Sequence, residues 1–418
     1  MAERAEAAIS QWVDDAVFST PVYDLHTHLY PPSFGRLMLW GIDELLSYHY
    51  LIAETIRASE IGYDAFWSMP QSKQADLIWQ TLFIERAPIS EACRGVLTVL
   101  NKLGLDVASK NLKNFREYFR SQKPADYVNT VFKLANVQSV VMTNDALDPL
   151  EREIWLTRGN DDPRFKAVLR IDPLLIGWPD VANRMRSFGY NVGPDLGATT
   201  TAEIRRFLTG WIDRMGALYV AVSLSPPWRY PDDTPATMVI RDAILPVARE
   251  KGIPFALMIG VSRQINPNLR LAGDSVAKSD IGSVERLCAE NPSNKFLITM
   301  LSRENQHELA VAARKLRNMM PFGCWWFLNN PSLVEEITRM RMELLGTSFI
   351  PQHSDARVLD QVIYKWQHSR QIIAKVMKHK FQDIAASGWP VTQGEIVNTT
   401  QAYFSGNFER FLKTAPSI

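Results

Sequence analysis

Eight short apolar runs recur along the chain, and stretches with helical patterning separate most of them. Each run is rich in β-branched, aromatic or aliphatic residues, and most are almost continuously apolar, which is typical of strands covered on both faces. The runs comprise residues 22–29, 139–144, 165–174, 218–226, 253–260, 295–301, 322–329 and 347–355. No GxGxxG motif follows the first run, which disfavours an open dinucleotide-binding sheet. Eight strands with crossover helices predict an α/β fold of the (β/α)8 TIM-barrel type.

One long gap interrupts this rhythm between the first and second runs. Its residues show helical patterning and little strand character, as in GIDELLSYHYLIAETIR, where Leu45, His49 and Ile52 share one face of a predicted helix. We therefore expect residues 1–418 to form a single barrel domain, with residues 35–135 as a helical insertion after the first strand. That loop opens at the carboxyl end of the barrel strands, where such folds keep their chemistry, so the insertion is expected to cap the site.

Charge and composition restrict the partners of the chain. It has 418 residues, a formal net charge of +1 and three widely spaced cysteines without a CxxC motif. This balance gives no electrostatic case for a nucleic-acid or membrane partner, and the cysteines are expected to be buried free thiols. The amino terminus lacks the apolar segment of a signal peptide, so a cytoplasmic location is expected. The number of subunits stays open, and a homo-oligomer is compatible with the sequence.

The motif Asp24-Leu25-His26-Thr27-His28 ends the first predicted strand. Side chains alternate along a strand, so His26 and His28 point the same way, and in a barrel both can point inward at the catalytic end. Two neutral imidazoles so placed are natural ligands for a divalent metal ion, with Zn²⁺ as the expected ion. The alternative is a pair of histidines held by hydrogen bonds in a polar pocket.

A second polar cluster, PQHSDAR, follows the last predicted strand. Strands one and eight are neighbours in a closed barrel, so Asp355 can complete a metal site begun by the two histidines. Arg357 could reach the same pocket, and His353 has the strand parity of Asp355 and is a candidate for a second layer around the metal. The alternative role for Asp355 is to cap the helix that follows.

The pairing of HxH on the first strand with an Asp on the eighth resembles the amidohydrolase superfamily. The stretches DLHTHLYPPSFG, SYHY, LRIDP, FGCWWFLNNP and IPQHSDAR resemble the uronate isomerase family, nearly from end to end and closest to a divergent bacterial branch. Members interconvert D-glucuronate with D-fructuronate and D-galacturonate with D-tagaturonate. The resemblance implies His26, His28 and Asp355 as ligands of one divalent metal ion.

The resemblance also implies a substrate-binding set. His49 and Tyr50 would face the sugar acid from the insertion, Arg170 and Arg357 would hold it, and Trp326 would form an aromatic wall. From the residues alone, Arg170 lies in an apolar run and needs an anionic partner, which Asp172 could supply instead of a substrate.

Met258 departs from the family pattern. More typical members have a histidine on the fifth strand, in a stretch resembling FHIG, where this chain reads Leu-Met-Ile-Gly. A thioether is a poor ligand for Zn²⁺. Three protein ligands still suffice for a catalytic site with open positions.

An aldose–ketose isomerase must move a proton from carbon 2 to carbon 1 through a cis-enediol. The candidate bases are Tyr50 as a phenolate, His49 and Asp355, of which the first two are favoured because a metal-bound carboxylate is a weaker base. Two other functions remain open at this point. One is a metal-dependent hydrolase on the same scaffold, and the other is a sugar-acid binder that has lost its metal.

Overall fold

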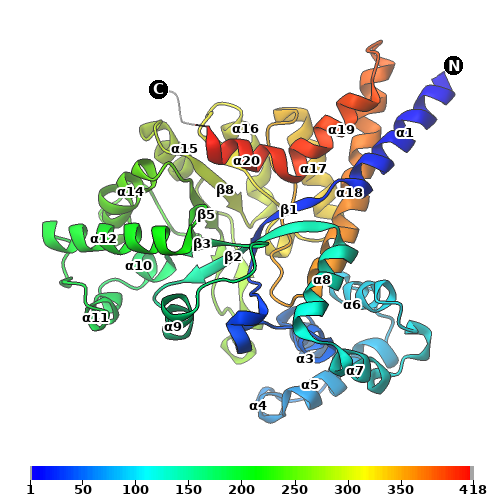
Figure 1. The fold of residues 1–418 in the computed structure, drawn as a ribbon, viewed down its shortest axis with the longest axis horizontal. Coiled ribbons are helices and arrows are strands. Elements are labelled where there is room, and N and C mark those ends of the chain that lie inside the picture. Colours follow the sequence, from blue (N-terminus) through cyan, green and yellow to red (C-terminus); the bar gives the residue numbers. More distant parts are fainter. Residues whose placement is uncertain (1, 415–418) are drawn as a thin grey trace.

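The computed structural model describes residues 2–414. Within them, seven parallel strands form one sheet in the order β1-β2-β3-β4-β5-β8-β9, which curls into a half-barrel (Figure 1). The strands are β1 (Val22–Thr27), β2 (Val137–Asp145), β3 (Phe165–Arg170), β4 (Val220–Leu224), β5 (Phe255–Ile259), β8 (Phe296–Met300) and β9 (Met319–Pro321). Six of the predicted runs therefore contain a strand close to where the sequence places it.

The segment 349–356 lies between the two edge strands of this sheet. On one side Ile350 N–H donates to Pro321 O at 3.0 Å, and on the other Asp355 N–H donates to His26 O at 3.1 Å. The predicted strand at 347–355 is nevertheless reduced to one bridge between Phe322 and Ile350. Pro351 has no N–H to donate, and the φ of Asp355 is 50°, so the backbone cannot continue a regular ladder.

The prediction of a strand at 322–329 is wrong. The strand β9 precedes this stretch, which turns at Gly323 and Trp326, where φ is 66° and 45°. A short helix, η7 (Trp326–Leu328), replaces the expected strand. Only its first residues still pair, since Phe322 N–H donates to Ile298 O, whereas Trp325 and Leu328 are buried outside the sheet.

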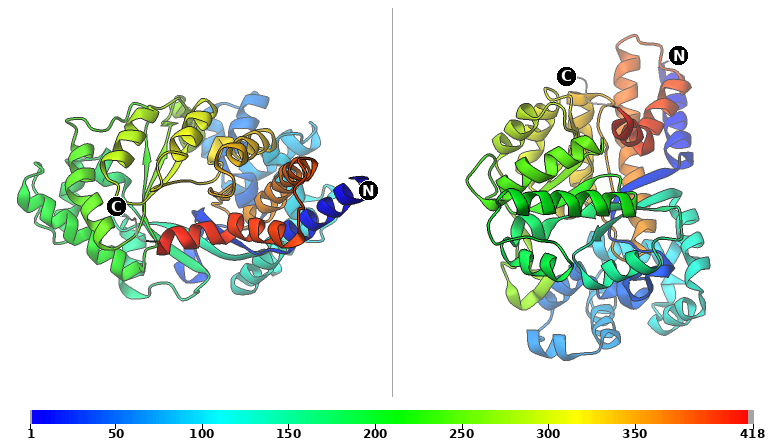
Figure 2. Two further views of the ribbon diagram at one scale, coloured as in Figure 1. Left: turned by 90° about the horizontal axis from the view of Figure 1, so that it is seen from above. Right: turned by 60° about the vertical axis from the view of Figure 1, so that its left-hand side comes forward.

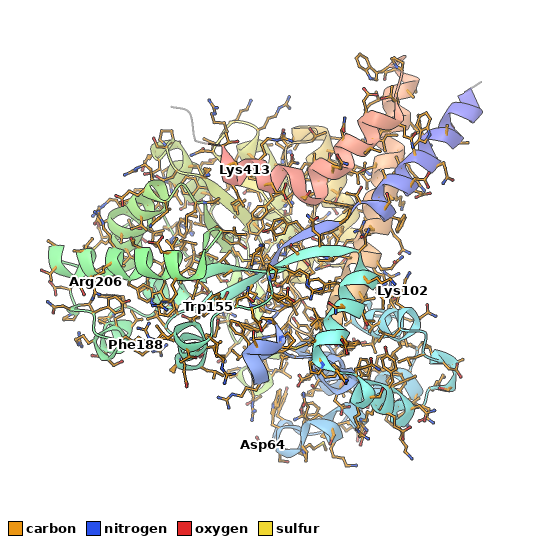
Figure 3. All side chains as sticks on the ribbon, in the orientation of Figure 1. Asp64, Lys102, Trp155, Phe188, Arg206 and Lys413 are labelled. Atoms are coloured by element: carbon orange, nitrogen blue, oxygen red, sulfur yellow. The ribbon has the colours of Figure 1, made fainter. Side chains whose placement is uncertain are left out.

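Helices cover the outer side of the sheet and connect its strands. These are α9 (Pro149–Thr157), α10 (Asp172–Ile176), α11 (Asp180–Ser187), α12 (Ala198–Met215), α13 (Pro235–Val239), η4 (Ile240–Ile244), α14 (Leu245–Glu250), α15 (Ile281–Glu290), η6 (Arg303–Asn305), α16 (Gln306–Ala313) and α17 (Pro331–Leu345). A small hairpin, β6 (Val261–Ser262) and β7 (Ser275–Val276) with η5 (Pro267–Gly273) at its tip, lies between β5 and α15. Side chains fill the layer between sheet and helices (Figure 3); Trp155 of α9, for example, is buried.

Ten helical segments separate β1 from β2. They are η1 (Pro32–Leu37), α2 (Ile42–Leu46), α3 (His49–Ala58), α4 (Tyr63–Ser68), α5 (Gln71–Trp79), η2 (Gln80–Ile84), α6 (Glu91–Lys102), η3 (Val107–Ser109), α7 (Leu112–Ser121) and α8 (Pro124–Ala135). Most of them gather on one side of the sheet in Figures 1 and 2. The sequence predicts one continuous helix over 41–57, but the chain breaks at Ser47 and Tyr48, so α2 and α3 are separate.

The terminal helices pack together beside the sheet. They are α1 (Ala2–Ser19), α18 (Gln361–Ala386), α19 (Gln393–Gln401), η8 (Ala402–Gly406) and α20 (Asn407–Lys413). The helix α18 packs against α1, α6, α8 and α17, and so joins distant parts of the chain. None of the helices within residues 2–414 combines the length and apolar character needed to span a bilayer.

Apolar side chains fill the inner side of the curled sheet. Leu25, Val168, Met258 and Leu297 belong to one buried cluster there, which Phe408 of α20 also joins. Met258 is 2% exposed and packs in this apolar interior at the fifth-strand position discussed above. The three cysteines are buried free thiols, as predicted.

Candidate active site and metal centre

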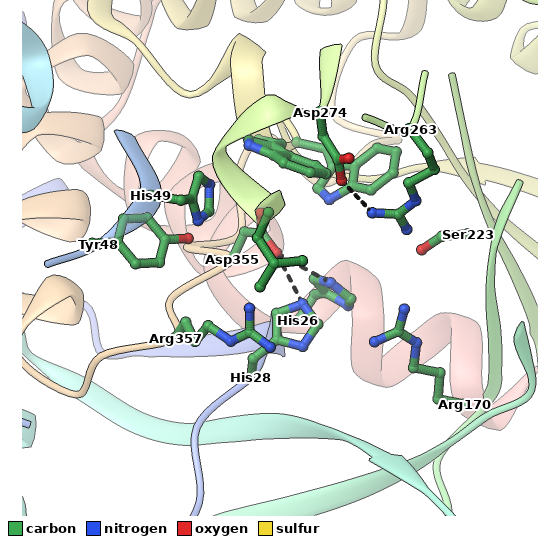
Figure 4. Close-up of a pocket in the computed structure, with 13 residues that line it drawn as sticks. His26, His28, Tyr48, His49, Arg170, Ser223, Arg263, Asp274, Asp355 and Arg357 are labelled. Carbon is green, nitrogen blue, oxygen red and sulfur yellow. Dashed lines mark hydrogen bonds and ion pairs between the residues drawn. The ribbon is translucent and has the colours of Figure 1, made fainter. Parts of the chain in front are cut away.

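A cavity of about 130 Å³ lies where the strands end (Figure 4). Its wall draws on β1, on the segment after β9, on α3 and on the β6–β7 hairpin. The lining residues are His26, His28, Tyr48, His49, Arg170, Ser223, Arg263, Leu271, Asp274, Trp325, Trp326, Asp355 and Arg357. Most of the site residues predicted from the sequence thus meet in one place, although they span more than 330 positions of the chain.

His26, His28 and Asp355 converge at the centre of the cavity. The Nε2 atoms of both histidines lie 3.4 Å from Oδ1 of Asp355. This separation exceeds a normal hydrogen bond, and Asp355 Oδ1 has no hydrogen-bond partner among the described residues. In a tetrahedral zinc site with ligands about 2.0–2.1 Å from the ion, ligand atoms lie about 3.3 Å apart. The donor set and its spacing therefore fit a divalent metal ion, and no other such group of three occurs within residues 2–414.

Backbone and side-chain contacts fix Asp355 beside the two histidines. His28 N–H donates to Ala356 O at 2.7 Å, and Asp24, which is fully buried, accepts from Ser354 N–H at 3.0 Å. The other carboxylate oxygen of Asp24 accepts from the indole N–H of Trp366 at 2.8 Å. Asp24 thus ties β1, the segment after β9 and α18 together, a role that the sequence motif did not reveal.

Thr143 of β2 selects the tautomer of the neutral His28 ring. Its hydroxyl donates to Thr27 O at 3.0 Å, and its oxygen lies 2.7 Å from His28 Nδ1. Because the hydroxyl has only one hydrogen, Nδ1 must carry the proton that closes the second contact. The lone pair then sits on Nε2, which faces Asp355 and is the atom a metal would need.

Burial sets the charges of these groups. It lowers the pKa of His28 to about 4, so the imidazole is neutral near pH 7. Burial opposes ionisation of Asp355, but the two adjacent imidazoles outweigh it and hold the pKa of that carboxyl well below its usual range. Neutral imidazoles and an ionised carboxylate are the forms that bind a metal ion.

His353 packs against His26, one of the three candidate metal ligands. Its ring is fully buried, lies edge to face against His26 at a centroid distance of 5.1 Å, and packs directly on Gly323. Neither ring nitrogen has a partner among the described residues. Burial lowers the pKa of His353 well below its usual range. The ring is therefore neutral and fills space beside the candidate ligands.

The start of α3 forms the opposite wall. His49 lines the cavity, and its ring lies 5.6 Å from that of Trp326, edge to face. Burial first, and then the charge of Arg357, lowers the pKa of His49 to about 3. Tyr50 does not line the cavity, whereas Tyr48 does, because α3 begins only at His49.

Three polar atoms in this wall are buried without a partner among the described residues: His49 Nε2, Tyr50 Oη and Trp326 Nε1. Burial raises the pKa of Tyr50 well above its usual value, so its hydroxyl stays protonated. Such groups are costly unless something satisfies them, which makes them candidates for ligand contacts.

Two of the cavity's arginines were predicted from the sequence. Arg170 donates from Nε and Nη2 to the two carboxylate oxygens of Asp172 at 2.9 and 2.8 Å, so Asp172 is a partner of this arginine. Burial opposes the charge of Arg170, but Asp172 outweighs it and raises the pKa above its usual value. The guanidinium of Arg357 makes no hydrogen bond or ion pair with any described residue and is free to bind an anion.

Several residues that line the cavity were not predicted as site residues from the sequence: Tyr48, Ser223, Arg263, Leu271, Asp274 and Trp325. Arg263, Leu271 and Asp274 belong to the β6–β7 hairpin. No sequence motif singles out this hairpin, and only its position after the fifth predicted strand could have indicated that it reaches the carboxyl end of the sheet.

Comparison with known structures decides the family. The chain is 52% identical to a uronate isomerase from Bacillus halodurans, over 98% of this chain and 97% of that one, with a TM-score of 0.96. The chain belongs to the uronate isomerase family. It is therefore an isomerase, which the predicted resemblance had implied.

Two more distant structures share the fold. A uronate isomerase from Thermotoga maritima matches with a TM-score of 0.76 at 14% identity, over 98% of this chain and 97% of that one. A glucuronate isomerase from Caulobacter crescentus matches with a TM-score of 0.74 at 14% identity, over 98% and 94%. No family model matches the chain, and no curated protein sequence matches it.

Proposed function

We propose that the protein is a metal-dependent isomerase that interconverts D-glucuronate with D-fructuronate and D-galacturonate with D-tagaturonate. The observation that carries this proposal is the placement of a three-ligand cluster, two arginines and His49 around one cavity. The similarity to the Bacillus halodurans uronate isomerase supports the choice of substrate class.

His26, His28 and Asp355 would hold one divalent ion, with Zn²⁺ as the ion proposed. When bound, such an ion supplies Lewis acidity to oxygens of the sugar acid. Met258 adds no ligand, since its thioether lies in the apolar interior. The three remaining ligands leave open positions at the ion, as catalytic sites require.

Arg357 and Arg170 would bind the anionic substrate. The guanidinium of Arg357 is unpaired among the described residues, and Arg170 keeps Nη1 free while Asp172 holds its other edge. Charge-assisted hydrogen bonds from guanidinium groups suit carboxylate and hydroxyl oxygens. Trp326 would form an apolar wall along the sugar and offer its indole N–H, which lacks a partner.

His49 moves the proton between the two carbons in this proposal. His49 is neutral near pH 7, so its imidazole can take the proton from carbon 2 and return it to carbon 1 of the cis-enediol. Tyr50 stays protonated and does not line the cavity, so the phenolate base considered from the sequence is not part of this proposal. Asp355 would relay protons between hydroxyl groups of the sugar.

We also propose that the segment 349–356 holds the eighth position of a (β/α)8 barrel, in one domain over residues 1–418. Its backbone bonds to both edge strands support this assignment. The helices within 35–135 would form a cap, which is supported by the contribution of Tyr48 and His49 to the cavity wall.

Proton NMR in D₂O tests the function. Purified protein loaded with Zn²⁺ and given D-glucuronate should produce D-fructuronate, and chelation by EDTA or the D355A substitution should abolish the conversion. Metal analysis should find one ion per chain in the wild type and a reduced content in D355A. No conversion of either uronate by protein with verified metal would refute the assignment and would direct attention to hydrolysis on the same scaffold.

A further inference from the structure

The β6–β7 hairpin supplies one wall of the cavity that the proposed mechanism does not use. Arg263, Leu271 and Asp274 all come from this hairpin and line the same cavity as the metal ligands. In Figure 4, Arg263 and Ser223 lie on the side of the cavity opposite Tyr48 and His49, with His26 and Asp355 between them. The cavity therefore has a second polar end, away from the proposed base.

Asp274 fixes the direction of Arg263. The Nη1 atom of Arg263 donates to Asp274 Oδ2 at 2.6 Å, and the other oxygen of Asp274 accepts from Gln264 N–H at 2.9 Å. The Asp274 side chain is only 2% exposed, whereas the Arg263 side chain is 48% exposed. The Nε and Nη2 donors of Arg263 make no hydrogen bond with any described residue. One edge of the guanidinium is thus anchored and the rest remains available.

The helix α4 holds the hairpin over the cavity. The indole N–H of Trp67 donates to Asn268 O at 2.7 Å, and the guanidinium of Arg270 lies 4.4 Å from the centre of the Trp67 ring. The side-chain amide of Asn266 also donates to the hydroxyl of Tyr63 at 3.1 Å. Contacts on the outer side of the hairpin therefore position the arginine on its inner side.

We propose that Arg263 is a substrate-binding residue that, with Arg170 and Ser223, forms the carboxylate-binding end of the cavity. This inference rests on the proposed function, because it assigns one end of the same sugar acid. Arg170 and Arg263 are each held by a neighbouring carboxylate and each keep free donors, and Ser223 lies between them in Figure 4 and offers a hydroxyl. Placing the carboxylate there leaves carbons 1 and 2 near His49.

Steady-state kinetics on D-glucuronate with the zinc-loaded protein tests the assignment. R263M should raise KM by about ten- to hundredfold, the usual effect of losing a hydrogen bond to a charged group, and should change kcat much less. Such a split is expected because the contact lies far from the reacting carbons and acts on substrate and transition state alike. R263K keeps the charge and should recover part of the loss.

Two further variants separate binding from structure. R303M removes an exposed arginine that pairs with Glu336 outside the cavity and should behave as wild type. D274N keeps the arginine and should raise KM less than R263M does. A KM of R263M within twofold of wild type, or equal effects of R263M and D274N with equal losses of thermal stability, would overturn the assignment. Failure of the wild type to convert D-glucuronate would instead refute the proposed function itself.

Discussion

Gly323 is the position where one added methyl group should disturb the candidate metal centre most directly. A Cβ atom there would lie 1.9 Å from Cδ2 of His353 and 2.5 Å from its Nε2. His353 is fully buried and packs against His26, so its ring has little room to retreat. The φ of Gly323 is also 66°, which side chains with a Cβ rarely adopt.

The cost of G323A has two parts. An L-residue in the left-handed region costs about 1–2 kcal/mol, and overpacking a well-filled core costs about 1–3 kcal/mol. The free energy of unfolding should therefore fall by about 2–5 kcal/mol. Because the displaced ring supports His26, the zinc content of the folded protein should fall as well.

A matched control isolates the steric part. Gly216 ends α12 with φ 59° and ψ 41°, and a Cβ added there meets nothing within 4 Å. G216A should therefore lose only the backbone contribution and keep its metal. Urea unfolding followed by circular dichroism, together with metal analysis, measures both effects. Equal destabilisation of the two variants, or full zinc content in a destabilised G323A, would refute the reasoning about His353.

Two further substitutions test the proposed base and the pH dependence of stability. H49Q should lower kcat by about 10²–10⁴-fold and abolish deuterium incorporation at carbon 1. H307Q, at an exposed position of α16, should do neither, and retained exchange in H49Q would exclude this base. Burial raises the pKa of Glu151 to about 7 from 4.5, so the folded state holds this proton more tightly than the unfolded chain, and the stability contributed by this group falls between about pH 4.5 and 7. E151Q should therefore gain stability relative to wild type across that window, and a constant difference in urea midpoint would contradict this.

The strands could be predicted where local pattern and tertiary environment agree. The runs at 165–174 and 253–260 are apolar because both faces of those strands are covered, and the chain forms β3 and β5 within them. The run at 322–329 is equally apolar, but beyond Phe322 its side chains are buried without continuing a strand. The apolar pattern does not predict the left-handed backbone conformations of Gly323 and Trp326, which prevent this run from forming a strand.

The candidate ligands could be predicted because His26 and His28 are fixed by strand alternation and Asp355 by the expected neighbourhood of the first and last strands. Two-residue alternation places His26 and His28 together, and the backbone bond from Asp355 N–H to His26 O holds Asp355 beside them. The choice between Tyr48 and Tyr50 could not be predicted in this way. Periodicity describes a helix once it exists, but the break at Ser47 decides which residue begins α3, and that residue decides which tyrosine lines the cavity. The position of the hairpin that carries Arg263 could not be predicted either, because it depends on contacts with a helix some 200 residues away.

Several polar atoms around the cavity are buried without a hydrogen-bond partner among the described residues. Buried side-chain atoms without a partner among the described residues occur in His26, His49, Tyr50, Trp326, His353 and Asp355. Each such atom costs about 1–3 kcal/mol of stability, and a folded chain normally avoids the cost by pairing the atom or exposing it to water. Unpaired buried atoms also occur outside the cavity, as in Trp155, Trp228 and Thr338, whereas Asp24 beside the site is fully paired with Ser354 and Trp366. Of the six residues named here, His26, His49, Trp326 and Asp355 line the cavity, where a metal ion and a polar substrate could complete unpaired donors and acceptors.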